Sequence, residues 1–431
     1  MRRGRGPTAR RRRAGAASAL CVALLSATPL TAAVPAAADT PAPSSSATPS
    51  ASAELPPMGQ TFPDVRESGC RKPSTRTADR APWAQVYLRP EAAWPLGRGA
   101  GVTVAVLGSG VDASAGTGTG ALAGRLKLGP RVQGQGDSGQ DCVGHGTFLA
   151  TLLAGRRPSD GGPAGLAPEA TVLAVRVTDD AGTTTADLVA QGIRAAADGG
   201  ARVAVIGSPA PAPSQALAEA VEYAAAKGVL LVGPTGPDGQ SAKGAVYPTG
   251  YPGVLAVASI GPSGAPSGAS VSGDAVSGGA ATAGVRVDLA APGEGLQAAG
   301  PGGGHFTASG PSGAAALVAG AAALLLSREP GWTPAQVVER LKSTAYRPGS
   351  ALPDPAVGWG TVDVVAAATA QPPVTGAPRA TADPVTVPPP PDRTAVTRAS
   401  ALAGASAGLV VVVTLAAAAL RAGRRRSRTA P

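Results

Sequence analysis

Runs of consecutive apolar residues alternate with Ala-rich, helix-like segments through the middle of the chain. Five runs are too continuous to be half-exposed and predict buried strands, at residues 102–107, 171–177, 203–206, 229–232 and 254–260. The segments between them have helical spacing at 147–155, 185–198 and 213–226, with Thr185 or Asp187 able to cap the second. This alternation predicts an α/β fold, a doubly wound parallel sheet with helices on both faces. Active sites on such sheets lie at the carboxyl ends of the strands, where Gly108 falls.

The two ends of the chain have a different composition from this core. Residues 1–38 predict a secretory signal peptide, since seven arginines precede an apolar run and an A-x-A cleavage signal. Residues 399–420 are uncharged and long enough to span a bilayer, and a basic tail, 421–431, follows them. The alternative for this segment is a buried helix. Flanking arginines favour the cytoplasmic side, so we expect a single-pass membrane protein with its core outside the cell.

Two Pro-rich segments frame the core. Residues 39–65 are rich in Pro, Ser and Ala, and residues 371–398 contain four consecutive prolines. Neither has enough apolar residues to fold alone, so we expect a disordered segment and a linker around one domain, residues 66–370.

The formal net charge of +10 follows from the two ends of the chain. Seven arginines lie in the signal segment and five in the tail, which leaves 25 basic residues against 27 acidic ones in the exported part. The positive net charge therefore reflects the expected membrane topology of the chain. It gives no support for nucleic-acid binding.

Three cysteines occur, and Cys21 lies in the predicted signal peptide. Cys70 and Cys142 remain in an exported chain, where an oxidising compartment favours a disulfide between them; two free buried thiols are the alternative. No constellation of metal ligands is evident, and we expect no cofactor.

Three blocks occur in a fixed order, V-A-V-L-G-S-G-V-D from Val104, D-C-V-G-H-G-T from Asp141 and S-G-P-S-G-A-A-A-L-V-A-G from Ser309. They resemble the Asp, His and Ser signatures of the subtilisin-like serine proteases, the subtilases. Further subtilase-like segments cover most of the core, among them G-L-A-P at 165–168 and L-A-A-P-G at 289–293. With the signal peptide, the two cysteines and the C-terminal anchor, the chain is most similar to the mycosins, the membrane-anchored subtilases of type VII secretion systems.

The resemblance assigns catalytic positions to His145 and Ser312. In subtilases the imidazole takes the serine proton and later gives it to the leaving amine. Ser312 matches the nucleophile when V-A-G at 318–320 is aligned with the family pattern; Ser309 is the competing candidate. His305, in a Gly-rich loop, is expected at the surface.

Three departures from the pattern argue against catalysis. Gly108 stands where the family has the catalytic Asp, and Asp112 is an additional family position that cannot replace it. Pro237 stands where an Asn normally donates to the oxyanion. At the substrate-binding strand the chain has Gly207, Ser208 and Pro209, and Pro209 lacks an N–H that strand pairing would use.

Two functions therefore remain open. One is a catalytically inactive or impaired mycosin homologue with an interaction or structural role in a type VII secretion system. The other is a working serine endopeptidase that uses a Ser312/His145 dyad on a peptide or protein substrate. A carboxylate from elsewhere in the chain on the distal nitrogen of His145 would favour the enzyme.

Overall fold

A computed structural model describes residues 54–133, 137–159, 161–238, 246–267, 286–349, 351–371 and 405–418 of the 431-residue chain. The predicted signal peptide, most of the Pro-rich linker and the basic tail lie outside the described residues.

A seven-stranded sheet forms the centre of the domain, with the strand order β2-β3-β1-β4-β5-β6-β7. Every neighbouring pair in it is parallel. The strands are β1 (Thr103–Gly108), β2 (Leu126–Arg131), β3 (Thr171–Arg176), β4 (Val203–Ile206), β5 (Leu230–Pro234), β6 (Val254–Ile260) and β7 (Leu289–Pro292). The predicted parallel sheet is confirmed.

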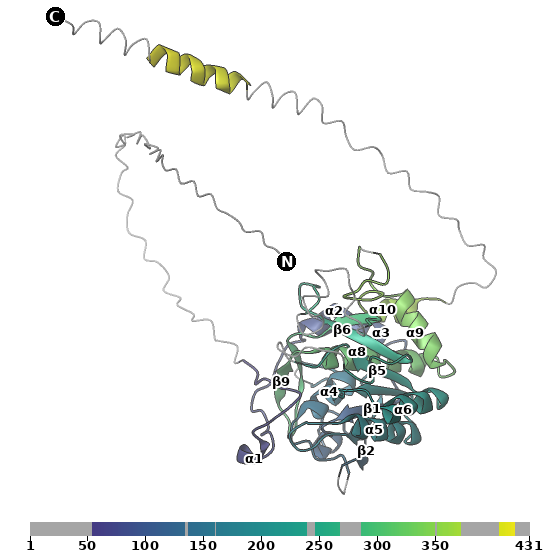
Figure 1. The fold of residues 1–431 in the computed structure, drawn as a ribbon. Helices are drawn as coiled ribbons and strands as arrows, with labels where there is room; N and C mark the ends of the chain where they lie inside the picture. Colours follow the sequence, from purple (N-terminus) through teal and green to yellow (C-terminus); the bar gives the residue numbers. More distant parts are fainter. Residues whose placement is uncertain are drawn as a thin grey trace, which may run out of the picture.

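Helices cover both faces of the sheet (Figure 1). Val104 and Val106 of β1 belong to the core cluster with α4 (His145–Ala154) and α8 (Pro311–Arg328). Ala105 and Leu107 belong to the other cluster, with α5 (Ala186–Asp198) and α6 (Gln215–Ala226). Because successive strand residues point to opposite faces, a sheet covered on both sides needs the continuous apolar runs seen in the sequence.

Smaller elements surround this core. They are α1 (Val65–Ser68), α2 (Trp83–Leu88), α3 (Pro90–Ala93), the 3₁₀ turn η1 (Ala113–Gly116), the antiparallel pair β8 (Leu296–Ala299) and β9 (His305–Ala308), α9 (Pro334–Ser343) and α10 (Val364–Thr369).

The elements predicted from periodicity are found within a few residues of their expected bounds. Residues 203–206 and 254–260 are strands with the expected ends, and Thr185 caps α5 by accepting a hydrogen bond from Leu188 N. The edge strand β2 was missed because none of its residues is buried and it lacks a continuous apolar run.

Residues 54–82, before α2, are here called the N-terminal extension, and they pack along the carboxyl edge of the sheet. Met58 is buried, and its N–H donates to Thr307 O on β9 at 2.7 Å. Residues 54–65 thus differ from the predicted disordered segment, because backbone pairing and one large apolar side chain attach them to the domain. A Cys70–Cys142 disulfide joins the extension to the turn before α4, as the sequence predicted.

His305 differs from its predicted surface position. It is 8% exposed, and its Nδ1 accepts a hydrogen bond from Ala78 N at 2.8 Å. The extension covers this part of β9, and no pattern in the sequence indicates that the two segments are in contact.

Among the described residues, α8 is the helix long and apolar enough to cross a membrane, but 89% of that window is buried inside the domain. It is therefore a core helix. The described residues of the predicted membrane anchor form a shorter apolar helix, Ala405–Ala418, whose side chains are exposed.

Candidate active site

The residues of the three sequence blocks meet at the carboxyl edge of the sheet. Gly108 ends β1, His145 begins α4 and Ser312 lies in the first turn of α8. His145 and Ser312 are both 1% exposed. The nitrogen Nε2 of His145 lies 3.1 Å from the hydroxyl oxygen Oγ of Ser312, so the structure brings the predicted nucleophile and base together.

Asp141 fixes the turn that presents His145. Its carboxylate accepts hydrogen bonds from Gly144 N at 2.7 Å and from Thr147 N and Oγ1 at 2.8 and 2.6 Å. These bonds satisfy N–H groups of the first turn of α4 that have no partner within the helix. Gly146 then allows a close approach to the end of β1, since a Cβ there would lie 2.0 Å from Gly110 O.

Asp238, four residues beyond the end of β5, contacts both predicted catalytic groups. Its Oδ2 lies 3.0 Å from His145 Nε2 and accepts a hydrogen bond from Ser312 Oγ. Its Oδ1 accepts a hydrogen bond from Ser312 N at 3.0 Å. Gly310 makes this possible, because a Cβ at that position would lie 2.0 Å from Oδ1.

Asp238 takes the hydrogen-bonding positions that a serine nucleophile and its base would use with each other. Nε2 of an imidazole has one hydrogen-bonding site, and Asp238 competes with Ser312 for it. Since the Ser312 hydroxyl donates to Asp238, the hydrogen bond that would carry its proton to His145 is not formed.

Asp238 also changes the site where an oxyanion would develop. In serine proteases a backbone N–H at the nucleophile donates to the negative oxygen of the tetrahedral intermediate. Here that donor, Ser312 N, already donates to a carboxylate. A carboxylate oxygen thus takes the backbone donor that would bind the oxyanion in a serine protease.

The sequence predicted that the oxyanion donor is missing at Pro237. The side chain that reaches Ser312 N comes from the next residue, Asp238. Pro237 has no side-chain donor, as predicted, but it precedes the group that fills the position. The signal that could have identified Asp238 is an acidic residue in the loop after a central strand, one position from the expected Asn.

The other nitrogen of His145 has no carboxylate. Among the described residues, no polar atom pairs with Nδ1, although it is buried. Gly108 cannot supply one, and Asp112 uses its carboxylate to accept from Ser114 N at 2.9 Å and Gly302 N at 2.6 Å. The carboxylate from elsewhere in the chain therefore reaches the serine-facing nitrogen, and no carboxylate of the described residues reaches the distal one.

The predicted substrate strand is covered by the N-terminal extension. Gln60 donates from Nε2 to Gly207 O at 2.9 Å, and its Oε1 accepts from Asp238 N at 3.4 Å. Gly207 and Ser208 both donate their N–H groups to Leu107 O, and Pro209 has none. The Gln60 side chain thus takes a carbonyl that an extended peptide would use.

Arg71 holds the extension against the turn that carries His145. Its Nε donates to Val143 O at 2.7 Å, and its guanidinium lies 4.5 Å from the centre of the Phe62 ring. Burial lowers the pKa of Arg71, and the nearby Asp141 carboxylate partly opposes that shift.

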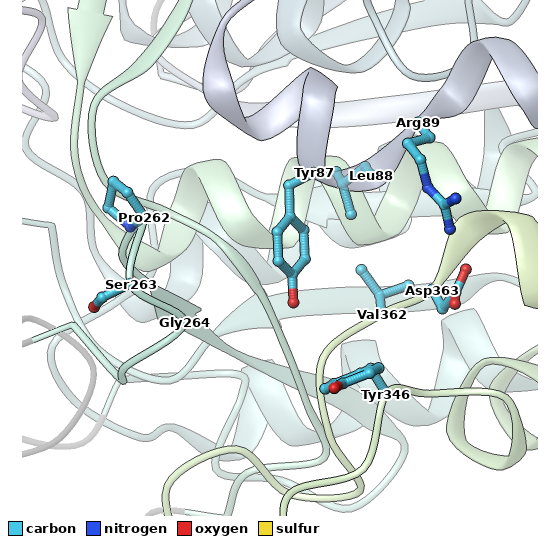
Figure 2. Close-up of a pocket in the computed structure, with 9 residues that line it drawn as sticks. All are labelled: Tyr87, Leu88, Arg89, Pro262, Ser263, Gly264, Tyr346, Val362 and Asp363. Carbon is cyan, nitrogen blue, oxygen red and sulfur yellow. The ribbon is translucent and has the colours of Figure 1, made fainter.

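A surface pocket of about 390 Å³ lies away from these groups. Figure 2 shows Tyr87 and Tyr346 at its sides, with Arg89 and Asp363 near each other at one end. In the part of the chain that the structure describes, no group of three or more His, Cys, Asp or Glu side chains could hold a metal ion.

The pattern of the subtilase family matches residues 99–360. The chain belongs to the subtilase family. It is 34% identical over 406 residues to Mycosin-1 of Mycobacterium tuberculosis, an alignment that spans 81% of this chain and 89% of that protein.

Solved mycosin structures resemble this fold. MycP1 with its N-terminal propeptide removed is 33% identical, with a TM-score of 0.58 over 69% of this chain and 100% of that one. The MycP3 protease of the type VII (ESX-3) secretion system is 29% identical, with a TM-score of 0.60 over 73% of this chain and 94% of that one. The predicted resemblance to mycosins and the subtilisin-like fold are confirmed.

Because the carboxylate of Asp141 is nearly buried and accepts three hydrogen bonds, Asp141→Ala should lower the free energy of unfolding by about 2 to 4 kcal/mol. Urea unfolding followed by tryptophan fluorescence measures the change. Asp112→Ala, which also removes two backbone hydrogen bonds but at a more exposed position, serves as the matched control and should cost less. Equal losses would show that burial of Asp141 adds nothing.

Proposed function

We propose that this chain is an exported, membrane-anchored mycosin homologue that does not hydrolyse peptides and acts as an interaction or structural component of a type VII secretion system. The observation that carries the proposal is the contact of Asp238 with Ser312 N, Ser312 Oγ and His145 Nε2. One carboxylate engages the nucleophile, the base and the oxyanion donor at once.

The missing acid supports the same conclusion independently. In a working triad the acid holds Nδ1 in the correct tautomer and stabilises the imidazolium, and altering it lowers kcat by about 10⁴. Loss of one oxyanion donor lowers the rate by a further factor of about 10² to 10³. Gly108 and Asp238 lie on different segments, the end of β1 and the loop after β5, so one substitution cannot repair both defects.

The link to type VII secretion rests on the mycosin relatives. MycP3 belongs to the type VII (ESX-3) secretion system, and the similarity of this chain covers 94% of its structure. Exposed aromatic and apolar side chains around the surface pocket suit contact with another protein, since such residues are enriched at interfaces. Tyr346 is 74% exposed and Tyr87 is 40% exposed.

The alternative function is a serine endopeptidase using a Ser312/His145 dyad. The distance of 3.1 Å between Ser312 Oγ and His145 Nε2 favours it, because a proton could pass between these atoms if Asp238 moved. Hydrolysis measurements on the full chain distinguish the two functions.

We expect the full chain, purified in detergent micelles, to hydrolyse peptides no faster than its Ser312→Ala variant. Gly108→Asp should fit, since a Cβ there would meet its two nearest atoms at 3.7 and 3.8 Å. Gly108→Asp or Asp238→Asn alone should recover little, and the double variant should exceed either by about 10-fold or more, because the two changes repair separate defects. Peptide cleavage followed by mass spectrometry measures the activity of all five proteins.

Ser309→Ala is the control for the nucleophile, because Ser309 competes with Ser312 in the sequence and its Oγ accepts from Gly295 N instead. It should leave the activity of the double variant in place. Wild-type turnover of about 1 s⁻¹ or faster that Ser312→Ala abolishes would establish the endopeptidase.

A structural role predicts that catalytic residues are dispensable in the cell. In a strain that lacks this chain, expression of the wild type or of Ser312→Ala should restore export of type VII substrates to the same extent, at matched protein levels. Immunoblots of culture supernatants measure export. Restoration by the wild type alone would mean that Ser312 acts chemically.

The topology follows from the apolar segment and its flanking arginines. Protease added to protoplasts should digest the core and leave a short fragment containing residues 421–431 protected, because the basic tail stays in the cytoplasm. A C-terminal epitope tag reports the fragment. A core that resists protease until the membrane is dissolved would place it inside the cell.

A further inference from the structure

The surface pocket of about 390 Å³ has two exposed aromatic rings at its sides (Figure 2). Tyr87 comes from α2, and Tyr346 comes from the segment that follows α9. Ligand pockets in proteins have volumes of about 300 to 1,000 Å³. A volume at the lower end of that range suits a short extended segment better than a folded domain.

Both rings are held by ordered structure, so the pocket is formed before a ligand binds. The Tyr87 ring packs edge to face on the Trp83 ring, with 6.0 Å between centroids, and Trp83 Nε1 donates to Glu294 O at 2.7 Å. Tyr346 N donates to Thr361 O at 2.7 Å, and Thr361 N donates back to Tyr346 O at 3.0 Å. A preformed site loses little conformational entropy on binding.

One end of the pocket carries two charged side chains. Arg89 and Asp363 lie near each other there, and Ser263 lies at the opposite end, beyond the two tyrosines (Figure 2). Asp363 Oδ1 accepts from Ala366 N at 2.9 Å as the cap of α10. The pocket thus offers aromatic rings along its length and one charge of each sign at one end.

Grooves lined by aromatic side chains are typical binding sites for proline-rich segments. Such segments adopt an extended polyproline II helix before binding, so they lose little entropy, and their carbonyls can accept hydrogen bonds from tyrosine hydroxyls. This chain contains one, V-P-P-P-P-D-R at residues 387–393, which lies outside the described residues. Its two charges follow the prolines directly, just as Arg89 and Asp363 adjoin the tyrosines in the pocket.

The chain is long enough to bring this segment to the pocket. The described part of the domain ends at Gln371, and α10, a helix of six residues, leads there from the pocket residue Asp363. Pro388 lies 17 positions beyond Gln371. A chain of that length spans about 23 Å as a random coil and about 53 Å as polyproline II, and either suffices. Tethering at such a length gives a local concentration that is roughly millimolar, so a weak contact is populated.

We propose that residues 387–393 of this chain bind in the pocket of the same molecule. The four prolines pack on the two tyrosines, and Asp392 pairs with Arg89. Because four residues of polyproline II span about 12 Å, the other end of the segment, Val387, lies beside Ser263. The contact goes beyond the proposed function, since it does not depend on whether the chain hydrolyses peptides.

This contact fixes which face of the domain lies toward the predicted membrane anchor. Residues 394–404 then join the pocket to the apolar helix Ala405–Ala418. Such a connection extends to at most about 40 Å. The pocket face is therefore directed toward the membrane, and another protein that used this surface would compete with the segment.

Disulfide trapping in the full chain tests the contact. Cys70 and Cys142 are already joined and Cys21 lies in the predicted signal peptide, so introduced cysteines are the free thiols of the mature chain. The variant with Ser263→Cys and Val387→Cys is oxidised in detergent micelles, and peptide mapping under non-reducing conditions identifies the link. We expect an intramolecular disulfide between the two introduced cysteines.

Ala380→Cys, again combined with Ser263→Cys, is the matched control. Position 380 is nearer to Gln371 along the chain than position 387 is, so tethering alone would favour the control pair. We expect the disulfide with Val387→Cys to form at least about 10-fold faster, because binding of the prolines holds that end of the segment beside Ser263.

Further substitutions in the Ser263→Cys, Val387→Cys chain locate the contact. Tyr346→Ala should slow trapping by about 5-fold or more, the effect of losing an aromatic anchor. Val86→Ala is its control, since Val86 is an exposed neighbour on α2 that does not line the pocket, and it should leave the rate unchanged. Arg89→Asp should slow trapping by about 3-fold, and adding Asp392→Arg should restore the rate because the opposite charges are exchanged.

Equal trapping rates for Val387→Cys and Ala380→Cys would overturn the proposal, since they would report tethering alone. Disulfide-linked dimers in place of the intramolecular link would also overturn it, because the segment would then come from a second copy of the chain. If Tyr346→Ala fails to fold, the charge exchange still decides: no recovery on combining Arg89→Asp with Asp392→Arg would contradict the proposed contact.

Discussion

The carboxylate of Asp238 determines what the rest of this site can do. It is 9% exposed and contacts His145 and Ser312, two residues from helices that approach the same sheet edge from different parts of the chain. A negative charge at this depth is costly unless it is paired and hydrogen-bonded. Here the hydrogen bonds come from Ser312 Oγ, Ser312 N and the His145 ring, the groups at the predicted catalytic positions.

The N-terminal extension contributes to the same closed arrangement. Gln60 links Gly207 O to Asp238 N, so one side chain connects the substrate strand to the loop that carries the carboxylate. Phe62 N donates to Ala181 O, and the Cys70–Cys142 disulfide fixes the extension beside the turn before α4. A peptide that entered would have to displace a segment covalently attached to the domain. The apparent affinity for the peptide is then reduced in proportion to the fraction of molecules in which that segment is displaced.

The sequence predicted those features that depend on local pattern. The strands 203–206 and 254–260 were predictable because burial on both faces leaves only apolar residues, and Gly108 was identified because its motif is specific. Asp238 was missed because its role arises from contacts with His145 and Ser312, which lie 93 and 74 positions away in the chain. No local pattern encodes such contacts. The burial of His305 was missed for the same reason, since Ala78 lies 227 positions away.

The Asp238 contacts also explain why a chain without a catalytic acid can still depend on its histidine and serine. Removing a hydrogen-bond partner from a buried polar group typically costs about 1 to 3 kcal/mol, and more for a charged one, since the remaining group loses its compensation. With His145 and Ser312 replaced by apolar residues, Asp238 would keep Ser312 N as its sole donor among the contacts observed at the site. The two residues therefore have a structural function that does not require catalysis: they are the partners that allow a carboxylate to remain at the end of the sheet. The presence of His145 and Ser312 is thus compatible with a site that performs no proteolysis. A carboxylate on His145 Nδ1 would distinguish an endopeptidase from such a site.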